Sequence, residues 1–284
     1  MSIVPFTKMH GLGNDYIYFD CIANPDLIQA PLDTARKLSD RHFGIGGDGI
    51  VLIQEHAEAD FRMRMFNADG SEAEMCGNAI RCVGKFLYEK GYIASDTVRI
   101  MTGAGIRTLE LAIDHGTVDQ VRVDMGEPIL YGPDIPVAVS AANPAQVSVS
   151  SSAGRNYHVT CVSMGNPHAV IFVDEITDDH VLMDGRELEK HATFPNGTNV
   201  EFAKVLSRDA IRMRVWERGS GETLACGTGA SATAVAAVIN GLADRKVRLV
   251  LAGGELFIEW SEEDNHVYMT GPAVVVFTGQ IELD

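Results

Sequence analysis

Two short stretches decide the fold of this chain: Met75-Cys76-Gly77-Asn78-Ala79 and Ala225-Cys226-Gly227-Thr228-Gly229. The two cysteines lie 150 positions apart, and the sequence around each repeats at that offset. The segment Phe61-Arg62-Met63-Arg64-Met65-Phe66, for example, corresponds to Ile211-Arg212-Met213-Arg214-Val215-Trp216. A period this long does not indicate a solenoid. It predicts two similar domains, each presenting one cysteine at the same structural place.

Each half is predicted to contain strands and one long central helix. The alternating pattern and the turn residues of the first half predict a short helix, a hairpin and a long helix, over residues 31–40, 49–53 with 61–66, and 78–90. The second long helix is expected over residues 228–240, and its stretch Ala230–Ile239 has no charged residue. A helix that is apolar on all faces is buried.

These elements favour an α+β fold, because strands are many and helices few. We therefore predict two pseudo-symmetric domains, each a curled mixed sheet around a central helix. The N-terminal domain is expected over residues 1–130 and the C-terminal domain over residues 131–284, with the junction between 130 and 150.

Composition excludes several classes of partner. The formal net charge of −16 argues against nucleic acid, whose recognition depends on positive charge. No apolar run approaches the length of a membrane span, and the first residues, Met1-Ser2-Ile3-Val4-Pro5, lack the pattern of a secretory signal. We expect a cytoplasmic protein with no membrane partner.

Cysteine usage indicates reduced thiols. The chain has five cysteines, an odd number, at wide spacings. The absence of a Cys-x-x-Cys motif argues against a structural zinc site, and no metal is expected. Cys21, Cys82 and Cys161 lie in apolar contexts and are predicted to be buried structural residues.

A cysteine at the start of a helix is suited to acid–base chemistry. Unpaired backbone N–H groups and the positive end of the helix dipole stabilise a thiolate there. The glycine that follows lets the backbone approach a ligand closely, and its N–H can bind a carboxylate. Two such sites at matching places favour a functional role over a structural one for both cysteines.

The repeat also shows where the halves differ. Asn67-Ala68 in the first half corresponds to Glu217-Arg218 in the second, and an arginine there is suited to bidentate recognition of a carboxylate. Asn14 and Asn166 occupy a similar early place in each half, and Asn199 follows Gly197-Thr198. Each alone is typical of a turn, but together they suggest a polar lining for a zwitterionic ligand. His168 adjoins this set and is placed to tune a thiol.

Together the motifs resemble those of the diaminopimelate epimerase family. The strings that carry the resemblance are His10-Gly11-Leu12-Gly13-Asn14-Asp15, Asn67-Ala68-Asp69-Gly70-Ser71, Met75-Cys76-Gly77-Asn78, Gly165-Asn166-Pro167-His168, Glu217-Arg218-Gly219 and Ala225-Cys226-Gly227-Thr228-Gly229. They run through nearly the whole chain. The resemblance implies a cofactor-independent isomerase that interconverts LL- and meso-diaminopimelate in lysine and cell-wall precursor synthesis.

The resemblance also implies roles for individual residues. Cys76 and Cys226 would be the acid–base pair, with His168 and Glu217 setting their pKa values. The substrate-binding residues it implies are Asn14, Asn67, Gly77, Asn78, Asn166, Asn199, Glu217, Arg218, Gly227 and Thr228.

Two positions differ from the pattern of the family. Gly49 stands where many members of the family carry a substrate-contacting Gln, and Phe277 stands where some carry a Tyr at a homodimer contact. The resemblance therefore implies a homodimer as well.

Two alternatives remain open from the sequence. A proline-racemase-like enzyme would use the same two thiols, although Arg218 argues against it because proline has no distal carboxylate. A duplicated amino-acid-binding or thiol-sensing protein would need no proton transfer at all.

Overall fold

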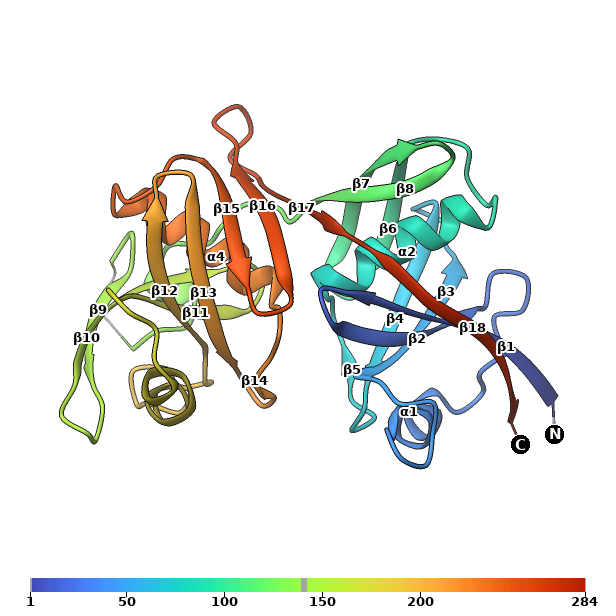
Figure 1. The fold of residues 1–284 in the computed structure, drawn as a ribbon, viewed down its shortest axis with the longest axis horizontal. Coiled ribbons are helices and arrows are strands. Elements are labelled where there is room, and N and C mark those ends of the chain that lie inside the picture. Colours follow the sequence, from blue (N-terminus) through green and yellow to red (C-terminus); the bar gives the residue numbers. More distant parts are fainter. Residues whose placement is uncertain (1, 139–141, 284) are drawn as a thin grey trace. The chain divides into compact units, whose positions relative to one another are not determined.

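The chain forms two compact units that differ from a simple division into halves. The computed structural model describes residues 2–138 and 142–283. The first unit comprises Met1–Val123 and Gly271–Asp284, and the second comprises Asp124–Thr270 (Figure 1). Within the described residues, no helix is long and apolar enough to cross a membrane.

The first unit is a mixed sheet with one long helix. Its strands follow the order β18-β1-β2-β3-β4-β6-β7-β8, with parallel neighbours only at β2–β3 and β4–β6, and β5 pairs with β4. Its elements are β1 (Ser2–Gly11), β2 (Asn14–Asp20), α1 (Pro31–Ser39), β3 (Gly49–Glu55), β4 (Phe61–Asn67), β5 (Glu72–Ala73), α2 (Gly77–Glu89), β6 (Thr97–Thr102), β7 (Gly105–Asp114), β8 (Thr117–Asp124) and β18 (Val274–Leu283).

The second unit repeats this topology. Its strand order is β9-β10-β11-β12-β13-β15-β16-β17, with parallel neighbours at β11–β12 and β13–β15, and β14 pairs with β13. Its elements are η1 (Gly132–Asp134), β9 (Gln146–Ser150), β10 (Asn156–Ser163), β11 (Pro167–Phe172), η2 (Asp179–Gly185), α3 (Arg186–Leu188), β12 (Asn199–Ser207), β13 (Ala210–Glu217), β14 (Gly221–Glu222), α4 (Gly227–Ile239), β15 (Lys246–Leu251), β16 (Gly254–Trp260) and β17 (Val267–Pro272). The predicted α+β class is confirmed.

Each sheet curls around its long helix. In the first unit α2 contacts β1, β2 and β7, and in the second α4 contacts β10, β11 and β16 (Figure 1). Because α4 is surrounded in this way, Ala230, Ala232, Ala236 and Ala237 are fully buried. Both long helices end within one residue of the predicted position and begin one residue earlier, at Gly77 and Gly227.

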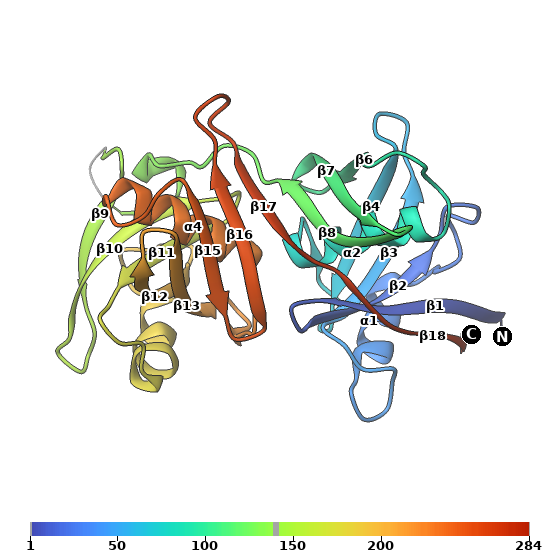
Figure 2. The ribbon, with the colours of Figure 1, turned by 45° about the horizontal axis from the view of Figure 1, so that its top comes forward.

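The C-terminal strand returns to the first unit. The sequence placed residues 271–284 with the C-terminal domain, whereas β18 pairs antiparallel with β1 from Ser2↔Leu283 to His10↔Val274 (Figure 2). The strand order of the two units makes β18 the counterpart of β9, which pairs with β10 in the second unit. Without β18, the backbone of β1 would present an unpaired edge. A local sequence pattern cannot reveal a pairing between residues so far apart in the chain.

Candidate active site in two half-sites

Both cysteines occupy the N-cap position of a central helix. Each has extended backbone angles, and its Sγ accepts the backbone N–H of the third helical residue, 3.5 Å from Ala79 N for Cys76 and 3.4 Å from Gly229 N for Cys226. An N-cap side chain satisfies one of the donors left unpaired at a helix start. The structure thus places each thiol where backbone donors surround it, as the sequence predicted. Cys226 is buried and Cys76 is half-buried.

In the first half-site, Asn14 orients its amide toward Cys76. Asn14 Nδ2 donates to Asp48 Oδ2 at 2.8 Å, and Asp48 is in turn paired with Arg41 at 2.9 Å. A carboxylate can only accept, so the amide must turn its NH₂ group to Asp48 and its oxygen elsewhere. That oxygen lies 3.3 Å from Cys76 Sγ.

A buried arginine supports the start of α2. Arg81 is fully buried and donates to Gly77 O at 3.1 Å, to Asn78 Oδ1 at 3.0 Å and to Pro272 O at 3.1 Å. Because a guanidinium only donates, it fixes which end of the Asn78 amide faces away from it. Burial lowers the pKa of Arg81, while Cys82, Cys76 and Tyr18 nearby act in the opposite direction. Gly11 leaves room for this group, since a Cβ there would lie 2.8 Å from Arg81 Nη2.

Asn67 and Gly49 lie opposite each other on β4 and β3. Asn67 Nδ2 donates to Ser71 Oγ at 3.0 Å within the turn that follows. A Cβ at Gly49 would overlap the backbone carbonyl oxygen of Phe66, so this backbone leaves no room for a side chain. The Gln contact that the resemblance suggested therefore has no counterpart at this position.

In the second half-site, a chain of hydrogen bonds leads from a buried carboxylate to Cys226. Glu201 Oε1 lies 2.7 Å from His168 Nδ1, and His168 Nε2 lies 3.0 Å from Asn166 Oδ1. Asn166 Nδ2 donates to Thr228 Oγ1 at 3.3 Å, and that hydroxyl lies 3.5 Å from Cys226 Sγ. Both ring nitrogens of His168 thus contact oxygen atoms, and these contacts fix the orientation of the ring.

The carboxylates of the second half-site act on its thiol. Burial raises the pKa of Cys226 well above its ordinary value, and the negative charges of Glu217 and Glu201 add to the effect. Burial also raises the pKa of Glu217, which accepts a short hydrogen bond from the Thr223 hydroxyl. The Cys226 thiol is therefore protonated at neutral pH in the unit as it stands.

Asn199 and Arg218 form the third part of the second half-site. Asn199 Oδ1 accepts the backbone N–H of Arg218 at 2.9 Å, and its Nδ2 donates to Pro167 O at 2.8 Å. The exposed Arg218 side chain donates to Asn196 O at 3.3 Å, and among the described residues its guanidinium pairs with no carboxylate. A guanidinium that pairs with no carboxylate of the protein is available to bind an anionic ligand.

The structure groups most of the predicted residues by contact. Asn14, Cys76, Gly77 and Asn78 gather at the start of α2, while Asn166, His168, Glu217, Cys226, Gly227 and Thr228 gather at the start of α4. The sequence did not single out three polar residues that support them, which are Asp48, Arg81 and Glu201. Of these three, only Arg81 could have been found from the sequence, because it is a charged residue within the otherwise apolar stretch Ala79–Val83.

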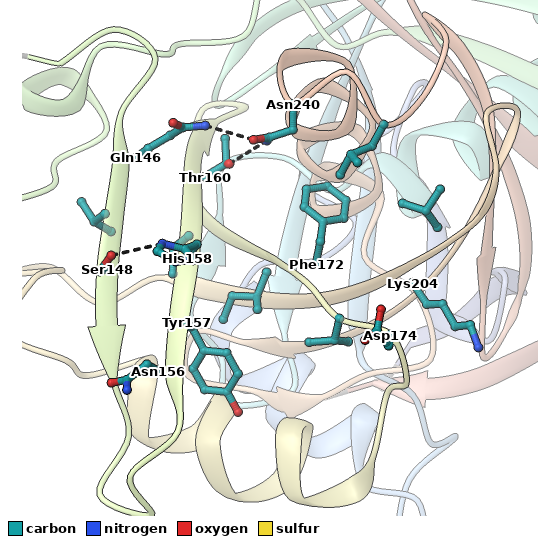
Figure 3. Close-up of a pocket in the computed structure, with 16 residues that line it drawn as sticks. Gln146, Ser148, Asn156, Tyr157, His158, Thr160, Phe172, Asp174, Lys204 and Asn240 are labelled. Carbon is teal, nitrogen blue, oxygen red and sulfur yellow. Dashed lines mark hydrogen bonds between the residues drawn. The ribbon is translucent and has the colours of Figure 1, made fainter.

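A surface pocket of the second unit lies apart from this chemistry. It is lined by residues of β9, β10, β11 and β12 and by the C-terminal end of α4, and none of them belongs to the predicted site (Figure 3). Asn240 bonds Gln146 and Thr160 there, so its amide is already occupied. Within the described residues, no cluster of three or more His, Cys, Asp or Glu side chains could hold a metal ion.

The fold places the chain in a structural class that includes a solved epimerase and a phenazine biosynthesis protein. A solved hydroxyproline epimerase from Agrobacterium vitis superposes with a TM-score of 0.71 over 99% of this chain and 93% of that chain, at 16% identity. A Bacillus anthracis phenazine biosynthesis protein superposes with a TM-score of 0.70 over the full length of both chains, also at 16% identity. Likeness at this identity shows the shared fold.

Sequence comparison resolves the family within this class. The profile of diaminopimelate epimerase matches residues 6–131 and 160–276. The diaminopimelate epimerase of Acetivibrio thermocellus is 53% identical over 283 residues, covering 98% of this chain and 99% of that protein. That of Phocaeicola vulgatus is 51% identical and covers 99% of both chains. The chain belongs to the diaminopimelate epimerase family.

The two half-sites predict unequal thiol reactivity. Iodoacetamide should modify Cys76 faster than Cys226 at pH 8, because Cys226 is buried and burial raises the pKa of its thiol, whereas Cys76 is half-buried. Timed alkylation followed by peptide mapping measures both rates, with the buried Cys21, Cys82 and Cys161 as internal references. Equal rates at the two N-cap cysteines would contradict the environment described for Cys226.

Proposed function

We propose that this protein interconverts LL- and meso-diaminopimelate without a cofactor, as an isomerase of lysine and cell-wall precursor synthesis. The observation that carries the proposal is the pair of N-cap cysteines, Cys76 and Cys226, in a chain of the diaminopimelate epimerase family. Each thiol lies beside helix N–H groups that suit both a thiolate and a bound carboxylate.

The proposed reaction inverts one α-carbon by two proton transfers. A thiolate removes the α-proton from one face, the electron pair stays on the carbon and its carboxylate, and the opposite thiol donates a proton to the other face. The thiolate and thiol exchange roles for the reverse direction. The carbanion needs electrostatic stabilisation, and the backbone donors at the starts of α2 and α4 are the groups suited to it.

We assign the remaining predicted residues to binding. Gly77, Asn78, Gly227 and Thr228 would hold the reacting carboxylate, Glu217 would meet the reacting amino group, and Glu217 and His168 would adjust the thiol pKa values. The residues assigned to the distal end of the substrate are Asn14, Asn67, Asn166, Asn199 and Arg218.

The contacts of Arg218 favour this reading over its two rivals. A proline-racemase-like enzyme would have no distal carboxylate for the Arg218 guanidinium, which pairs with no carboxylate among the described residues. A binding or sensing protein would need only one anion pocket and no second thiol on a helix start. Five free cysteines are consistent with a reducing cytoplasm, which we propose as its location.

Deuterium incorporation tests the two-thiol proposal directly. In deuterated water, the parent protein should exchange the α-hydrogen of diaminopimelate while it epimerises the substrate. Cys76→Ala and Cys226→Ala should each abolish epimerisation, because each removes one member of the proton-transfer pair, and each should still unfold cooperatively, at a somewhat lower temperature because the helix loses its cap. Cys161→Ala is a matched control for a buried thiol outside the site, and near-normal activity in either N-cap variant would overturn the assignment.

Substrate choice tests the role of Arg218. Lysine, which lacks the distal carboxylate, should be a poor substrate, and Arg218→Lys should lower kcat/KM for diaminopimelate at least about tenfold, because a point charge cannot reproduce a two-pronged contact. Steady-state kinetics with both substrates measures the difference. If the parent racemised lysine or proline as readily as diaminopimelate, a general racemase would replace this proposal.

We also propose that a second copy of the chain packs on β18. Four consecutive apolar residues, Val274–Phe277, are 38–53% exposed there, and the resemblance indicates a homodimer contact at Phe277. An exposed apolar strand of this kind favours association. Sedimentation equilibrium should give a dimer for the parent and a monomer for Phe277→Arg, with the exposed Glu282→Arg as control. A monomeric parent at micromolar concentration would refute the proposal.

A further inference from the structure

A buried carboxylate brackets the segment that carries Glu217 and Arg218. Glu189, 7% exposed, follows α3 and accepts two hydrogen bonds from this segment. Its Oε2 accepts Trp216 Nε1–H at 3.0 Å, and its Oε1 accepts the backbone N–H of Gly219 at 3.0 Å. One carboxylate therefore holds the residues immediately before and immediately after the pair.

The neighbouring contacts make this bracket rigid. The backbone carbonyl of Glu189 accepts Thr198 N–H at 3.1 Å, so the same residue also anchors the loop before β12. Asn199, at the start of that strand, accepts the N–H of Arg218. Trp216, Arg218 and Gly219 are thus each held by a buried side chain, and Glu217 lies between the held residues.

The first unit supplies an internal comparison. Ser39 is the counterpart of Glu189 at the offset of 150, and the backbone carbonyl of each accepts an N–H from the loop before the next strand, from Gly47 at 3.0 Å and from Thr198 at 3.1 Å. The Ser39 hydroxyl is buried and has no hydrogen-bond partner in the described residues. The corresponding segment, Asn67–Ser71, has bonds within its own turn, and from outside it Arg36 Nε donates to Asp69 O at 2.7 Å and Asp48 O accepts Ala68 N–H at 2.9 Å. The side chain that reaches it from the end of α1 is therefore a cation that bonds a backbone carbonyl, and not a carboxylate.

A buried carboxylate thus occurs in the unit whose segment carries Glu217-Arg218, and a short hydroxyl occurs in the unit whose segment carries Asn67-Ala68. Burying a carboxylate is unfavourable unless donors satisfy it. Where the first unit has the Ser39 hydroxyl, which has no hydrogen-bond partner among the described residues, the second unit has Glu189, which bonds Trp216 and Gly219 on the two sides of the segment. The replacement of Ser39 by Glu189 and that of Asn67-Ala68 by Glu217-Arg218 are therefore connected, because Glu189 holds the segment that carries Glu217-Arg218.

We propose that Glu189 is a positioning residue that aligns Arg218, and with it Glu217, for recognition of the distal end of the substrate. The inference rests on the function proposed above and adds the residue that fixes the backbone from which the Arg218 side chain extends. A mobile backbone segment would lose conformational freedom on binding, and a segment that is already fixed avoids that loss. Glu189 touches no reacting atom.

The variant Glu189→Gln tests the bracket itself. An amide has one acceptor oxygen, and its NH₂ group would confront either Trp216 Nε1–H or Gly219 N–H, so one of the two bonds must break. The chain has two tryptophans, which give two indole N–H signals in a ¹H–¹⁵N spectrum. The signal of Trp216 should move in the variant, whereas that of Trp260, which donates to Asn265, should stay. This readout needs no catalysis.

Kinetics tests the positioning role. For diaminopimelate, Glu189→Gln should raise KM at least about tenfold with a smaller change in kcat, because the contact is made in both the bound and the transition state. The double variant Glu189→Gln/Arg218→Lys should lose less than the product of the two single losses, since residues that act through one another are not additive. Glu187→Gln, on α3 and bonded to Ser152, is the control and should combine with Arg218→Lys without coupling.

Each outcome decides between the alternatives. An unmoved Trp216 signal, an unchanged KM, or losses that simply multiply would overturn the proposal. If Glu189→Gln does not fold, Trp216→Phe removes one bond of the bracket and leaves the carboxylate on Gly219; a raised KM that couples to Arg218→Lys supports the proposal, and a parental KM refutes it. If the parent protein does not epimerise diaminopimelate, the proposed function fails. The indole signals then still show whether Glu189 holds the segment through Trp216.

Discussion

The structure depends on a cysteine that begins a buried helix. Each sheet curls around its central helix, so most of that helix is buried. The N-cap side chain must satisfy a backbone donor at the helix start, and the sulfur of Cys76 or Cys226 does so at 3.5 or 3.4 Å. The same requirement that orders the helix therefore fixes the direction of the thiol and surrounds it with donors.

The repeated backbone carries two different polar environments. Around Cys76 the buried charge is the cation Arg81, and around Cys226 it is the pair His168–Glu201 together with Glu217. A buried polar group needs partners, so its replacement in one unit must bring further replacements with it. The differences around the two cysteines therefore occur as connected sets of residues.

The sequence predicted the features that are local and missed those that join distant residues. The long helices, the hairpin of the first half and the cysteines at the helix starts follow from short patterns, and the structure places their ends within two residues of the prediction. The return of β18 to β1 joins opposite ends of the chain, and no local pattern announces it. Glu189 lies in Glu187-Leu188-Glu189-Lys190, which is typical of a solvated charged turn, yet the fold buries it. Glu201 likewise alternates within a strand like a solvent-facing residue.

A duplicated fold must break its own symmetry to handle the proposed substrate. Diaminopimelate carries an amino group and a carboxylate at each end, so the reacting end and the distal end offer the same groups. Two equivalent helix starts with equivalent thiols could serve the reacting end, because proton removal and return are themselves related by exchange of faces. Nothing equivalent in the two units could tell the distal end from the reacting one. The distinction must come from groups that occur in one unit alone. Arg218 is such a group, because the first unit has Ala68 at its place, and Asn199 and Glu189, which hold the backbone around Arg218, correspond to Gly49 and Ser39.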